Sequence, residues 1–340
     1  MARDLTPPDP TVVLDLLEMF RRSKVMFAAV KLGVFDHLRN AAQTPQELAA
    51  TLQADAGSLE QLLCACVSLS LLEKRGDRFA NTPAADAYLT SDSPRRFTGY
   101  IQYSNDVMWP MWSHLEDAVR EGGHRWKQTY GWEGPIFANF FKSDDARREF
   151  LMGMNGFGVL SSPQVVNAFD LSGFRTLVDL GAATGHLVIA ACERYPDLRG
   201  IAFDLPEALD LARELTAASP ARDRLSVAGG DFFNDPLPPA DVYALGRILH
   251  DWSEPKIDHL LKRIFDALPE GGGLLIAEKL LVEDKTGPRW GLLQSLNMLV
   301  CTEGRERTLS EYETVLRRAG FRDVTGLRLP VPIDAIFARK

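Results

Sequence analysis

The stretch at residues 176–185 reads TLVDLGAATG and indicates the fold of the larger part of the chain. Its first five residues are mostly apolar and bounded by small residues, which predicts a buried strand at 176–180. The turn from Gly181 to Gly185 opens a segment, 186–194, whose pattern predicts a helix. Small residues at such a turn let the backbone approach a ligand at the helix N-terminus.

The same strand and helix alternation continues toward the C-terminus. Short apolar segments at 200–204, 242–245 and 273–277 are separated by helical patterns. This order predicts an α/β domain with a mainly parallel, doubly wound sheet of the Rossmann type. We assign residues 171–340 to that domain.

The first part of the chain has a different pattern. Apolar residues recur at helical spacing from 12 to 38, Thr44 begins a capping box, and a further helix is expected at 58–71. A hairpin that turns at Gly76 follows. We therefore predict a mainly α, winged-helix-like domain at residues 1–95 and a helical connecting region that contacts substrate at residues 96–170.

A winged helix raises the alternative of DNA binding, with the helix at 58–71 in the major groove. That helix offers Glu60 and Gln61 but no basic residue, and the formal net charge of the chain is −8. A protein that binds a polyanion usually presents a basic surface. We expect no nucleic-acid partner and interpret the module as one for self-association.

The composition is that of a globular protein, with 340 residues of which 46% are hydrophobic and 25% charged. The N-terminal segment is too polar for a signal peptide, and no apolar run approaches the roughly 18 residues that span a bilayer. We expect no membrane contact and a cytoplasmic location. The four cysteines form no paired framework or metal-ligand pattern, and we expect them to be reduced: Cys64, Cys66, Cys192 and Cys301.

A histidine follows the strand expected at 242–245, within LGRILHDW at residues 245–252. Ser253 and Pro255 then signal a helix start, so His250 is placed near the carboxyl edge of the sheet, where ligands bind in this fold. An imidazole there is able to accept a proton near neutral pH. The alternative is a histidine that only caps or packs.

Two further strand ends have polar groups suited to a nucleoside. Asp204 ends the second strand, 25 residues after Asp179, where a carboxylate can accept both ribose hydroxyls. Dinucleotide oxidoreductases share this geometry. Two features favour a nucleoside cofactor other than a dinucleotide. Asp179 stands before the loop, and Asp231 and Phe232 can bracket an adenine.

Over nearly its whole length the chain resembles the two-domain, S-adenosylmethionine-dependent small-molecule O-methyltransferases, and most closely the acetylserotonin O-methyltransferase group. The tail at 334–340, DAIFARK, also resembles that group. The motifs that carry the resemblance are FDLPE at 203–207, GDFFNDPLP at 230–238, RILHDW at 247–252, SLNMLV at 295–300 and TEGRERT at 302–308.

The resemblance implies that Gly181 and Gly185 line the methionine moiety of S-adenosylmethionine, and that Arg247 faces its carboxylate. Two departures stand out: Ala183 replaces the middle glycine of the loop, and Gly158 replaces a tryptophan that contacts the cofactor. Phe141 stands where the acetylserotonin enzyme has a tyrosine. The predicted cofactor-binding residues are Asp179, Gly181, Gly185, Asp204, Leu205, Gly230, Asp231, Phe232, Arg247 and Phe141.

Methyl transfer from a sulfonium requires an in-line acceptor oxygen and a group that removes its proton. We predict His250 as this base, with Glu278 and Glu306 at the positions where the family places two carboxylates beside its histidine. The alternatives are a surface salt bridge for Glu306 and a helix-proximal charge for Glu278. Asp251 is interpreted as structural, and no His/Asp/Glu cluster suggests a divalent metal.

The resemblance also implies a flat, hydroxylated aromatic acceptor, an S-adenosylhomocysteine product, secondary metabolism and an intertwined homodimer that buries a face around Met26, Phe27 and Val30. Transfer to nitrogen and a catalytically silent homologue that only binds or regulates remain open, the latter supported by Ala183. The predicted acceptor-binding residues are Asn297, Met298, Tyr103, Trp109 and Trp112.

Overall fold

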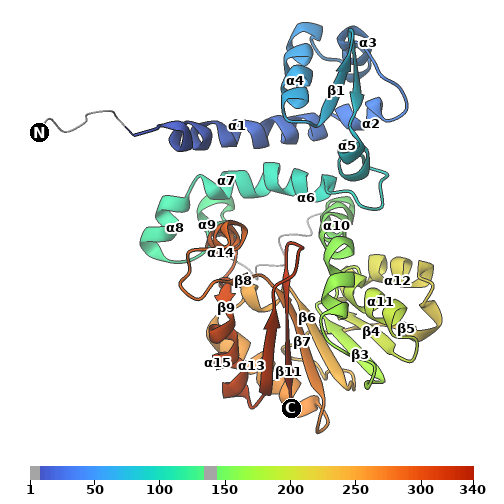
Figure 1. The fold of residues 1–340 in the computed structure, drawn as a ribbon, viewed down its shortest axis with the longest axis vertical. Coiled ribbons are helices and arrows are strands. Elements are labelled where there is room, and N and C mark those ends of the chain that lie inside the picture. Colours follow the sequence, from blue (N-terminus) through green and yellow to red (C-terminus); the bar gives the residue numbers. More distant parts are fainter. Residues whose placement is uncertain (1–7, 134–143) are drawn as a thin grey trace, which may run out of the picture. The chain divides into compact units, whose positions relative to one another are not determined.

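The computed structural model describes residues 8–133 and 144–340. The chain forms two compact units, which meet along the sequence between Asn105 and Asp106 (Figure 1). The first unit contains α1 (Thr11–Lys31), α2 (Val34–Leu38), α3 (Pro45–Leu52), α4 (Ala56–Ser68), β1 (Leu72–Arg75), β2 (Arg78–Asn81), α5 (Pro83–Tyr88) and α6 (Thr98–Tyr103).

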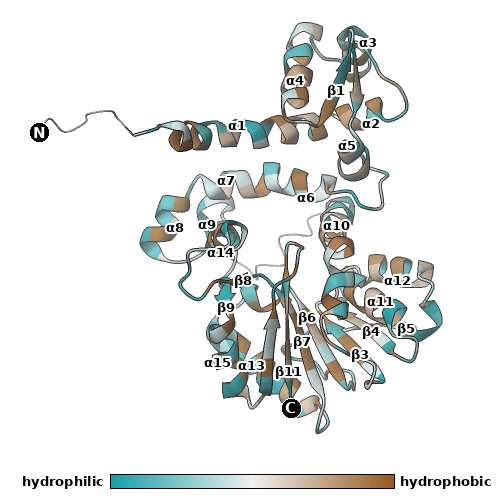
Figure 2. Ribbon diagram, viewed as in Figure 1, coloured by the Kyte–Doolittle hydropathy of each residue, from teal (hydrophilic) through white to brown (hydrophobic). Residues whose placement is uncertain are grey.

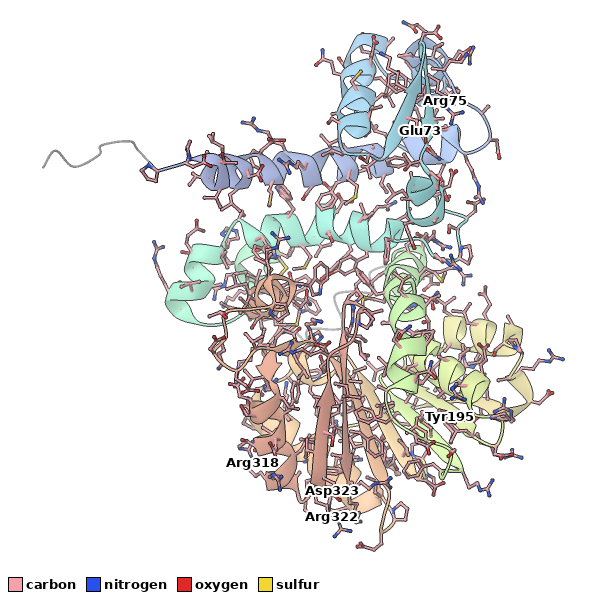
Figure 3. All side chains as sticks on the ribbon, in the orientation of Figure 1. Glu73, Arg75, Tyr195, Arg318, Arg322 and Asp323 are labelled. Carbon is pink, nitrogen blue, oxygen red and sulfur yellow. The ribbon has the colours of Figure 1, made fainter. Side chains whose placement is uncertain are left out.

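The first unit has the helix, helix and hairpin order expected of a winged helix. Thr44 accepts the backbone N–H of Glu47, and the Glu47 carboxylate accepts the N–H of Thr44, so the predicted capping box begins α3. Gly76, with φ 67°, allows the turn between β1 and β2. The exposed pair Glu73 and Arg75 lies on β1 (Figure 3).

The apolar side chains at the two ends of helix α1 differ in their exposure. Val30 is only 6% exposed and belongs to the core of its own unit, against which Met26 and Phe27 pack partly buried. Val30 therefore belongs to the core of its unit, whereas Met26 and Phe27 are only partly buried there, and the subunit face around these three residues stays a prediction. Figure 2 shows hydrophobic stretches along the early part of α1. The exposed apolar side chains there are Val12, Val13, Leu14, Leu16, Leu17, Met19 and Phe20.

The second unit begins with short helices and then forms the sheet domain. After a π-helical turn, η1 (Ser104–Met108), its helices are α7 (Trp109–Trp112), α8 (Leu115–Glu121), α9 (Trp126–Tyr130), α10 (Asp144–Asn167), α11 (His186–Arg194), α12 (Leu209–Ala218), α13 (Glu254–Ala267), α14 (Arg289–Cys301) and α15 (Leu309–Ala319). Its strands are β3 (Thr176–Leu180), β4 (Arg199–Asp204), β5 (Leu225–Gly229), β6 (Val242–Gly246), β7 (Gly273–Glu278), β8 (Leu280–Leu281), β9 (Arg307–Thr308), β10 (Arg322–Leu327) and β11 (Asp334–Arg339).

The central sheet has the strand order β10-β11-β7-β6-β3-β4-β5. The strands from β7 to β5 are parallel, whereas β11 runs antiparallel to β7 and β10 antiparallel to β11. The predicted mainly parallel Rossmann-type sheet is therefore confirmed. The antiparallel edge was not predicted.

Alternating side chains divide the core between the two faces of the sheet. Val242 and Ala244 of β6 lie in the cluster that α10 and α11 cover, and Tyr243 and Leu245 lie in the cluster that α13 and α15 cover (Figure 1). Because the strands from β7 to β5 are parallel, their carboxyl ends lie at one edge of the sheet.

The ends of α10 and α11 are also joined. The Tyr195 hydroxyl, at the end of α11 (Figure 3), lies 3.1 Å from the carbonyl oxygen of Val166 and 2.9 Å from that of Phe169.

Among the helices described, none is long and apolar enough to cross a membrane.

Candidate active site

His250 lies in a 3-10 turn, η5 (Leu249–Asp251), just past the carboxyl end of β6. Its Nδ1 is 2.7 Å from Oε1 of Glu306 and 3.4 Å from Oε2 of Glu278. The ring is 6% exposed, Glu306 is 1% exposed and Glu278 is fully buried. The structure thus brings together the three residues that the sequence predicted, and Glu306 forms a buried hydrogen bond rather than a surface salt bridge.

The short ladder between β8 and β9 explains why residues so far apart in sequence meet. Leu280 pairs with Arg307 in parallel register, which places Glu306, one residue before β9, beside Glu278 at the end of β7. Oε1 of Glu278 accepts the backbone N–H groups of Ile248 and Leu249, each at 2.9 Å. This carboxylate therefore fixes the backbone that carries His250.

Gly304 lets its own backbone pack closely against the backbone of the segment that contains His250. A Cβ on Gly304 would lie 2.2 Å from the carbonyl oxygen of His250 and 2.8 Å from the backbone nitrogen of Trp252. The Glu303 N–H donates to the carbonyl of Asp251 at 3.1 Å. The two segments pack backbone to backbone, so any side chain at 304 would separate Glu306 from the ring.

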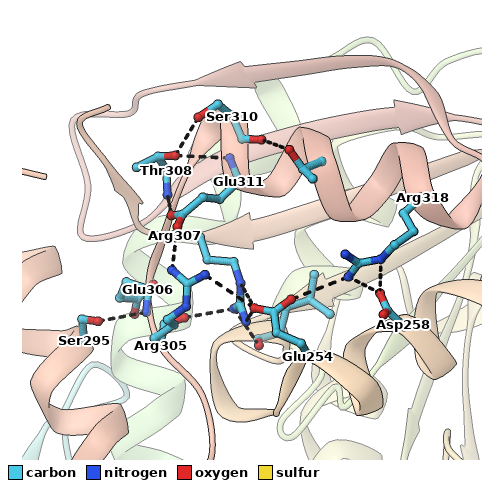
Figure 4. A network of polar contacts seen from close by, with 12 residues as sticks. Glu254, Asp258, Ser295, Arg305, Glu306, Arg307, Thr308, Ser310, Glu311 and Arg318 are labelled. Carbon is cyan, nitrogen blue, oxygen red and sulfur yellow. Dashed lines mark hydrogen bonds and ion pairs between the residues drawn. The ribbon is translucent and has the colours of Figure 1, made fainter. Parts of the chain in front are cut away.

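Arg307 is a buried cation that joins three segments of this cluster (Figure 4). It is 1% exposed; Nη2 donates to Oε1 of Glu254 at 2.7 Å, and Nη1 donates to the carbonyls of Leu249 at 3.3 Å and Arg305 at 3.0 Å. The sequence analysis did not single out Arg307. Its position next to Glu306, in a segment with three charged residues in a row, was the available signal.

The electrostatics of the cluster favour a protonated ring. Burial alone would lower the pKa of His250, but the carboxylates of Glu278, Glu306 and Asp251 outweigh it and raise this pKa to about 10. Burial in turn raises the pKa of Glu278 and raises that of Asp251 to about 6. Asp251, interpreted from the sequence as structural, places its Oδ1 3.7 Å from Nε2 of the ring.

The cluster has residue types that bind metals, which the sequence did not suggest. His250, Glu278 and Glu306 each offer a ligand atom, and these atoms lie within 4.8 Å of one another. Two ligands bound to one tetrahedral ion at about 2.1 Å lie about 3.4 Å apart. Because Nδ1 and Oε1 are 2.7 Å apart, they form a hydrogen bond and would have to separate to share an ion.

The glycine loop after β3 has the left-handed backbone that its residues suggest. Gly181 and Gly185 have φ values of 73° and 77°, and Ala183, the departure from the expected glycine, has φ 50°. An alanine in this region is strained by about 1 kcal/mol. Its N–H donates to Oδ2 of Asp204 at 2.7 Å, so the loop keeps its connection to the neighbouring strand.

Two carboxylates lie beneath this loop. Asp204 accepts the Leu205 N–H at 2.7 Å in addition to that of Ala183, while Oδ2 of Asp179 has no hydrogen-bond partner among the residues described. Burial, and then the charge of Asp204, raise the pKa of Asp179 to about 7. An unsatisfied buried oxygen is costly, so this end of the sheet suits a ligand that supplies a donor.

The third predicted loop is a compact turn after β5. Oδ1 of Asp231 accepts the Phe233 N–H at 2.8 Å, and Arg263 of α13 donates to the carbonyl of Phe232 at 3.1 Å. A Cβ on Gly230 would lie 2.6 Å from Cζ of Phe203, so glycine is required for this packing. Leu205, 38% exposed, follows Asp204 at the same edge of the sheet.

Arg247 follows β6 with φ 57°, which is unusual for a side chain of this size. Its guanidinium carbon lies 4.8 Å above the ring of Phe157 in α10. The charge of Arg247 acts both on His186, which follows Gly185 of the loop, and on Asp251, which follows His250.

The predicted acceptor residues fall in both units. Nε1 of Trp112 donates to Oδ1 of Asn297 at 2.8 Å, which joins α7 to α14, while Met298 is 4% exposed and Trp109 37%. Tyr103 ends α6 in the first unit. Phe141 lies outside the described residues.

Comparison with known proteins identifies the family. Residues 112–322 match a model of the O-methyltransferase domain, and residues 14–91 match one of the O-methyltransferase dimerisation domain. The chain belongs to the O-methyltransferase family. The family resemblance and the predicted fold class are therefore confirmed.

Three relatives show how far this similarity extends. Acetylserotonin O-methyltransferase of Bos taurus is 42% identical over 94% of this chain and 95% of its own length. A Homo sapiens probable bifunctional dTTP/UTP pyrophosphatase/methyltransferase protein is 40% identical over 99% of this chain, which spans only 55% of that relative. The crystal structure of human N-acetylserotonin methyltransferase in complex with SAM has a TM-score of 0.92 and 38% identity, with 99% of each chain covered.

Proposed function

We propose that this O-methyltransferase transfers the methyl group of S-adenosylmethionine to a hydroxyl of an aromatic small molecule, with His250 as the general base. The observation that carries the proposal is the buried contact of 2.7 Å between Nδ1 of His250 and Glu306 at the carboxyl edge of the sheet. That contact orients the ring and leaves Nε2 to take the acceptor's proton. Relatives named for O-methylation of acetylserotonin support an aromatic acceptor.

The residues of the glycine loop fit the cofactor. Asp204 would accept the ribose hydroxyls, Gly181 and Gly185 leave room for the methionine moiety, and Arg247 would bind its carboxylate. The unsatisfied Oδ2 of Asp179 is a buried acceptor at the same place. When bound, the cofactor supplies an electrophilic methyl group on sulfur and leaves as S-adenosylhomocysteine.

The adenine would be held at the neighbouring turn. Asp231 and Phe232 follow Gly230, and Leu205 lies on the adjacent strand end, so one carboxylate and two apolar side chains can bracket a flat ring. Phe141 is proposed as a further cofactor contact on the resemblance alone.

His250 must release a proton before it can accept one. Because its pKa is raised to about 10, the ring is an imidazolium at neutral pH in the free protein. A positive charge nearby lowers the pKa of an imidazolium, so we expect His250 to deprotonate more readily once the cationic cofactor is bound. The acceptor hydroxyl then gives its proton to Nε2 as the new carbon–oxygen bond forms, and Glu306 stabilises the resulting charge.

We also propose that the reaction needs no metal ion. Among the described residues, the cluster able to hold one is engaged otherwise: Nδ1 of His250 bonds to Glu306, and Oε1 of Glu278 accepts two backbone N–H groups. A chelator such as EDTA should leave the rate unchanged. Loss of activity that added Mg²⁺ restores would contradict this part of the proposal.

The acceptor pocket is proposed to include Asn297 and Met298 of α14 and Trp109 and Trp112 of α7. Tyr103, which belongs to the first unit, stays a prediction from the sequence. The hydrogen bond between Trp112 and Asn297 orients a flat ring and an amide in one place, which suits an aromatic acceptor. A role in secondary metabolism is part of this proposal. Transfer to nitrogen is the alternative that a product analysis must separate.

A homodimer is proposed from the first unit. The dimerisation-domain match at residues 14–91 covers most of α1, whose early turns expose a row of apolar side chains such as Leu16 (61%) and Leu17 (62%). Light scattering should give twice the chain mass. A monomeric protein at micromolar concentration would contradict the dimer.

The function is tested by calorimetry with S-adenosylmethionine, followed by mass spectrometry of products formed from a panel of phenols, indoles and aromatic amines. Cofactor binding with methylation of at least one hydroxyl supports the proposal. Binding without turnover on any acceptor would favour a silent homologue, and stabilisation by NADH instead would favour a dinucleotide enzyme.

A further inference from the structure

His186, the first residue of α11, is a second histidine beside the glycine loop and has no role in the reaction described above. It follows Gly185 directly and is half-buried. The charge of Arg247 acts on its ring, so the imidazole and the guanidinium are near each other. His186 is therefore near both the loop proposed for the methionine moiety and the cation proposed for its carboxylate.

The backbone of α10 packs directly on this ring. A Cβ on Gly158 would lie 2.2 Å from both Cδ2 and Cγ of His186, a distance that no side chain tolerates. The absence of a side chain at 158 and the presence of an imidazole at 186 are therefore complementary. The ring occupies space that any larger residue at 158 would need.

Ser162, one turn further along α10, fixes the orientation of the ring. Its hydroxyl oxygen lies 2.8 Å from Nδ1 of His186, and Ser162 is 2% exposed. A buried hydroxyl needs an acceptor for its proton, and Nδ1 is the partner found for it among the described residues. Ser162 then donates to Nδ1, and Nε2 carries the ring proton.

The ring is neutral in this environment. Burial, together with the positive charge of Arg247, lowers the pKa of His186 to about 4. A neutral imidazole with its proton on Nε2 is a hydrogen-bond donor that adds no positive charge beside Arg247. Such a donor favours an anion as its partner.

A second contact holds α10 to the same loop. Oγ1 of Thr184 donates to Oδ1 of Asn155 at 2.9 Å, and both side chains are buried. The pairs Asn155–Thr184 and Ser162–His186 lie on either side of Gly158 along α10. They keep the imidazole and the glycine loop in a fixed relation before any ligand arrives.

We propose that His186, oriented by Ser162 and seated on Gly158, is a further cofactor-binding residue that donates from Nε2 to the carboxylate of the methionine moiety, beside Arg247. This inference rests on the proposed function, because it assumes that S-adenosylmethionine is the cofactor. It makes Ser162 a positioning residue, which acts through the imidazole.

The test compares ligands with and without the charged group, by calorimetry on the full-length protein. The His186→Phe variant keeps a flat ring but removes the donor, so its affinity for S-adenosylhomocysteine should fall about 10-fold or more. Its affinity for 5′-methylthioadenosine, which lacks the amino-acid portion, should stay within about 2-fold. The His186→Gln variant places an amide donor near Nε2 and should recover most of the affinity.

Matched serine variants separate orientation from packing. Ser162→Ala should weaken S-adenosylhomocysteine binding about 3- to 10-fold. Ser161→Ala removes a neighbouring buried hydroxyl, which donates to the Phe157 carbonyl at 2.7 Å, and should leave that binding unchanged. Thermal unfolding of each variant reports whether the fold is intact.

Three outcomes would overturn the inference. Unchanged S-adenosylhomocysteine affinity in His186→Phe would remove the contact, and an equal loss for both ligands would make His186 a structural residue only. A wild-type protein that binds neither ligand would reject the proposed function and this inference with it, and that result is distinct from the other two.

Discussion

The histidine cluster and the glycine loop, the two halves of the candidate site, are stabilised in different ways. Around His250, opposite charges face each other: Glu306 bonds to the ring, Glu278 bonds to the backbone, and both carboxylates form ion pairs with the imidazole. Oε2 of each glutamate has no hydrogen-bond partner among the described residues. Around the loop, Asp179 keeps an unsatisfied oxygen, and Ala183 adopts a strained backbone. The carboxylates of the cluster are thus compensated by the charge of the ring, whereas the charge that acts on buried Asp179 is that of another carboxylate, Asp204.

This difference predicts which half of the site determines the rate of the chemical step and which half determines affinity for the cofactor. A preorganised base should govern the rate of the chemical step, because its geometry is fixed before the substrate binds. A loop with unsatisfied groups should govern affinity, since the ligand itself supplies the missing contacts. Variants in the two halves should therefore change different measured quantities.

The largest effect is expected from the base itself. His250→Ala should lower kcat by about 100- to 10,000-fold, because the variant lacks the imidazole proposed to take the acceptor's proton. The Kd for S-adenosylhomocysteine should stay within about 2-fold, since the loop is untouched. Initial rates and calorimetry measure the two quantities, and His37→Ala, an exposed histidine of the first unit, is the control. A His250→Ala enzyme with full activity would refute the assignment.

Glu306→Gln should lower kcat less, by about 10- to 100-fold, because the amide oxygen can still accept from Nδ1. The pH profile gives the sharper result. Removing a negative charge lowers the pKa of His250, so the neutral base persists at lower pH and the acid limb of kcat moves to lower pH. An acid limb that stays in place, or moves to higher pH, would show that this carboxylate does not act through His250.

The two halves also differ in how much of each could be predicted from the sequence. The loop is local: Gly181, Gly185 and the strand and helix on either side lie within 20 residues, so periodicity and small residues sufficed. The histidine cluster joins His250 to residues 28 and 56 positions away. No local rule relates such positions, and only the family resemblance predicted that they meet.

Other features could not be predicted because they depend on packing across the chain. Arg307 reads as a surface charge in sequence, yet tertiary contacts with Glu254 and the Leu249 carbonyl bury it. Ser253 was expected to cap α13, but its side chain makes no capping hydrogen bond in the structure. Pro255, the other predicted signal of a helix start, does lie in the first turn of α13.

Arg307→Met tests whether the cluster depends on its buried cation. The change leaves the carbonyls of Leu249 and Arg305 without this donor, and we expect a loss of about 2–4 kcal/mol in the free energy of unfolding. Arg318→Met is the matched control, because Arg318 contacts the same Glu254 from the surface and is half exposed. Arg318→Met should lower the free energy of unfolding by less than about 1 kcal/mol. Equal losses in chemical denaturation would show that Arg307 is no more than a peripheral ion pair.

The smallest effect is expected at the loop, where Ala183→Gly tests whether strain is stored there. Glycine adopts φ 50° without the penalty that alanine pays, so the free energy of unfolding should rise by about 0.5–1 kcal/mol. Ala182→Gly is the matched control: its φ is not in the left-handed region, its side chain is buried, and its loss should destabilise by about 1 kcal/mol. Since both variants keep the N–H of residue 183 on Asp204, S-adenosylhomocysteine affinity should change less than about 3-fold. If Ala183→Gly instead destabilises as Ala182→Gly does, the loop is unstrained, and only the like charge beside buried Asp179 distinguishes it from the ion-paired histidine cluster.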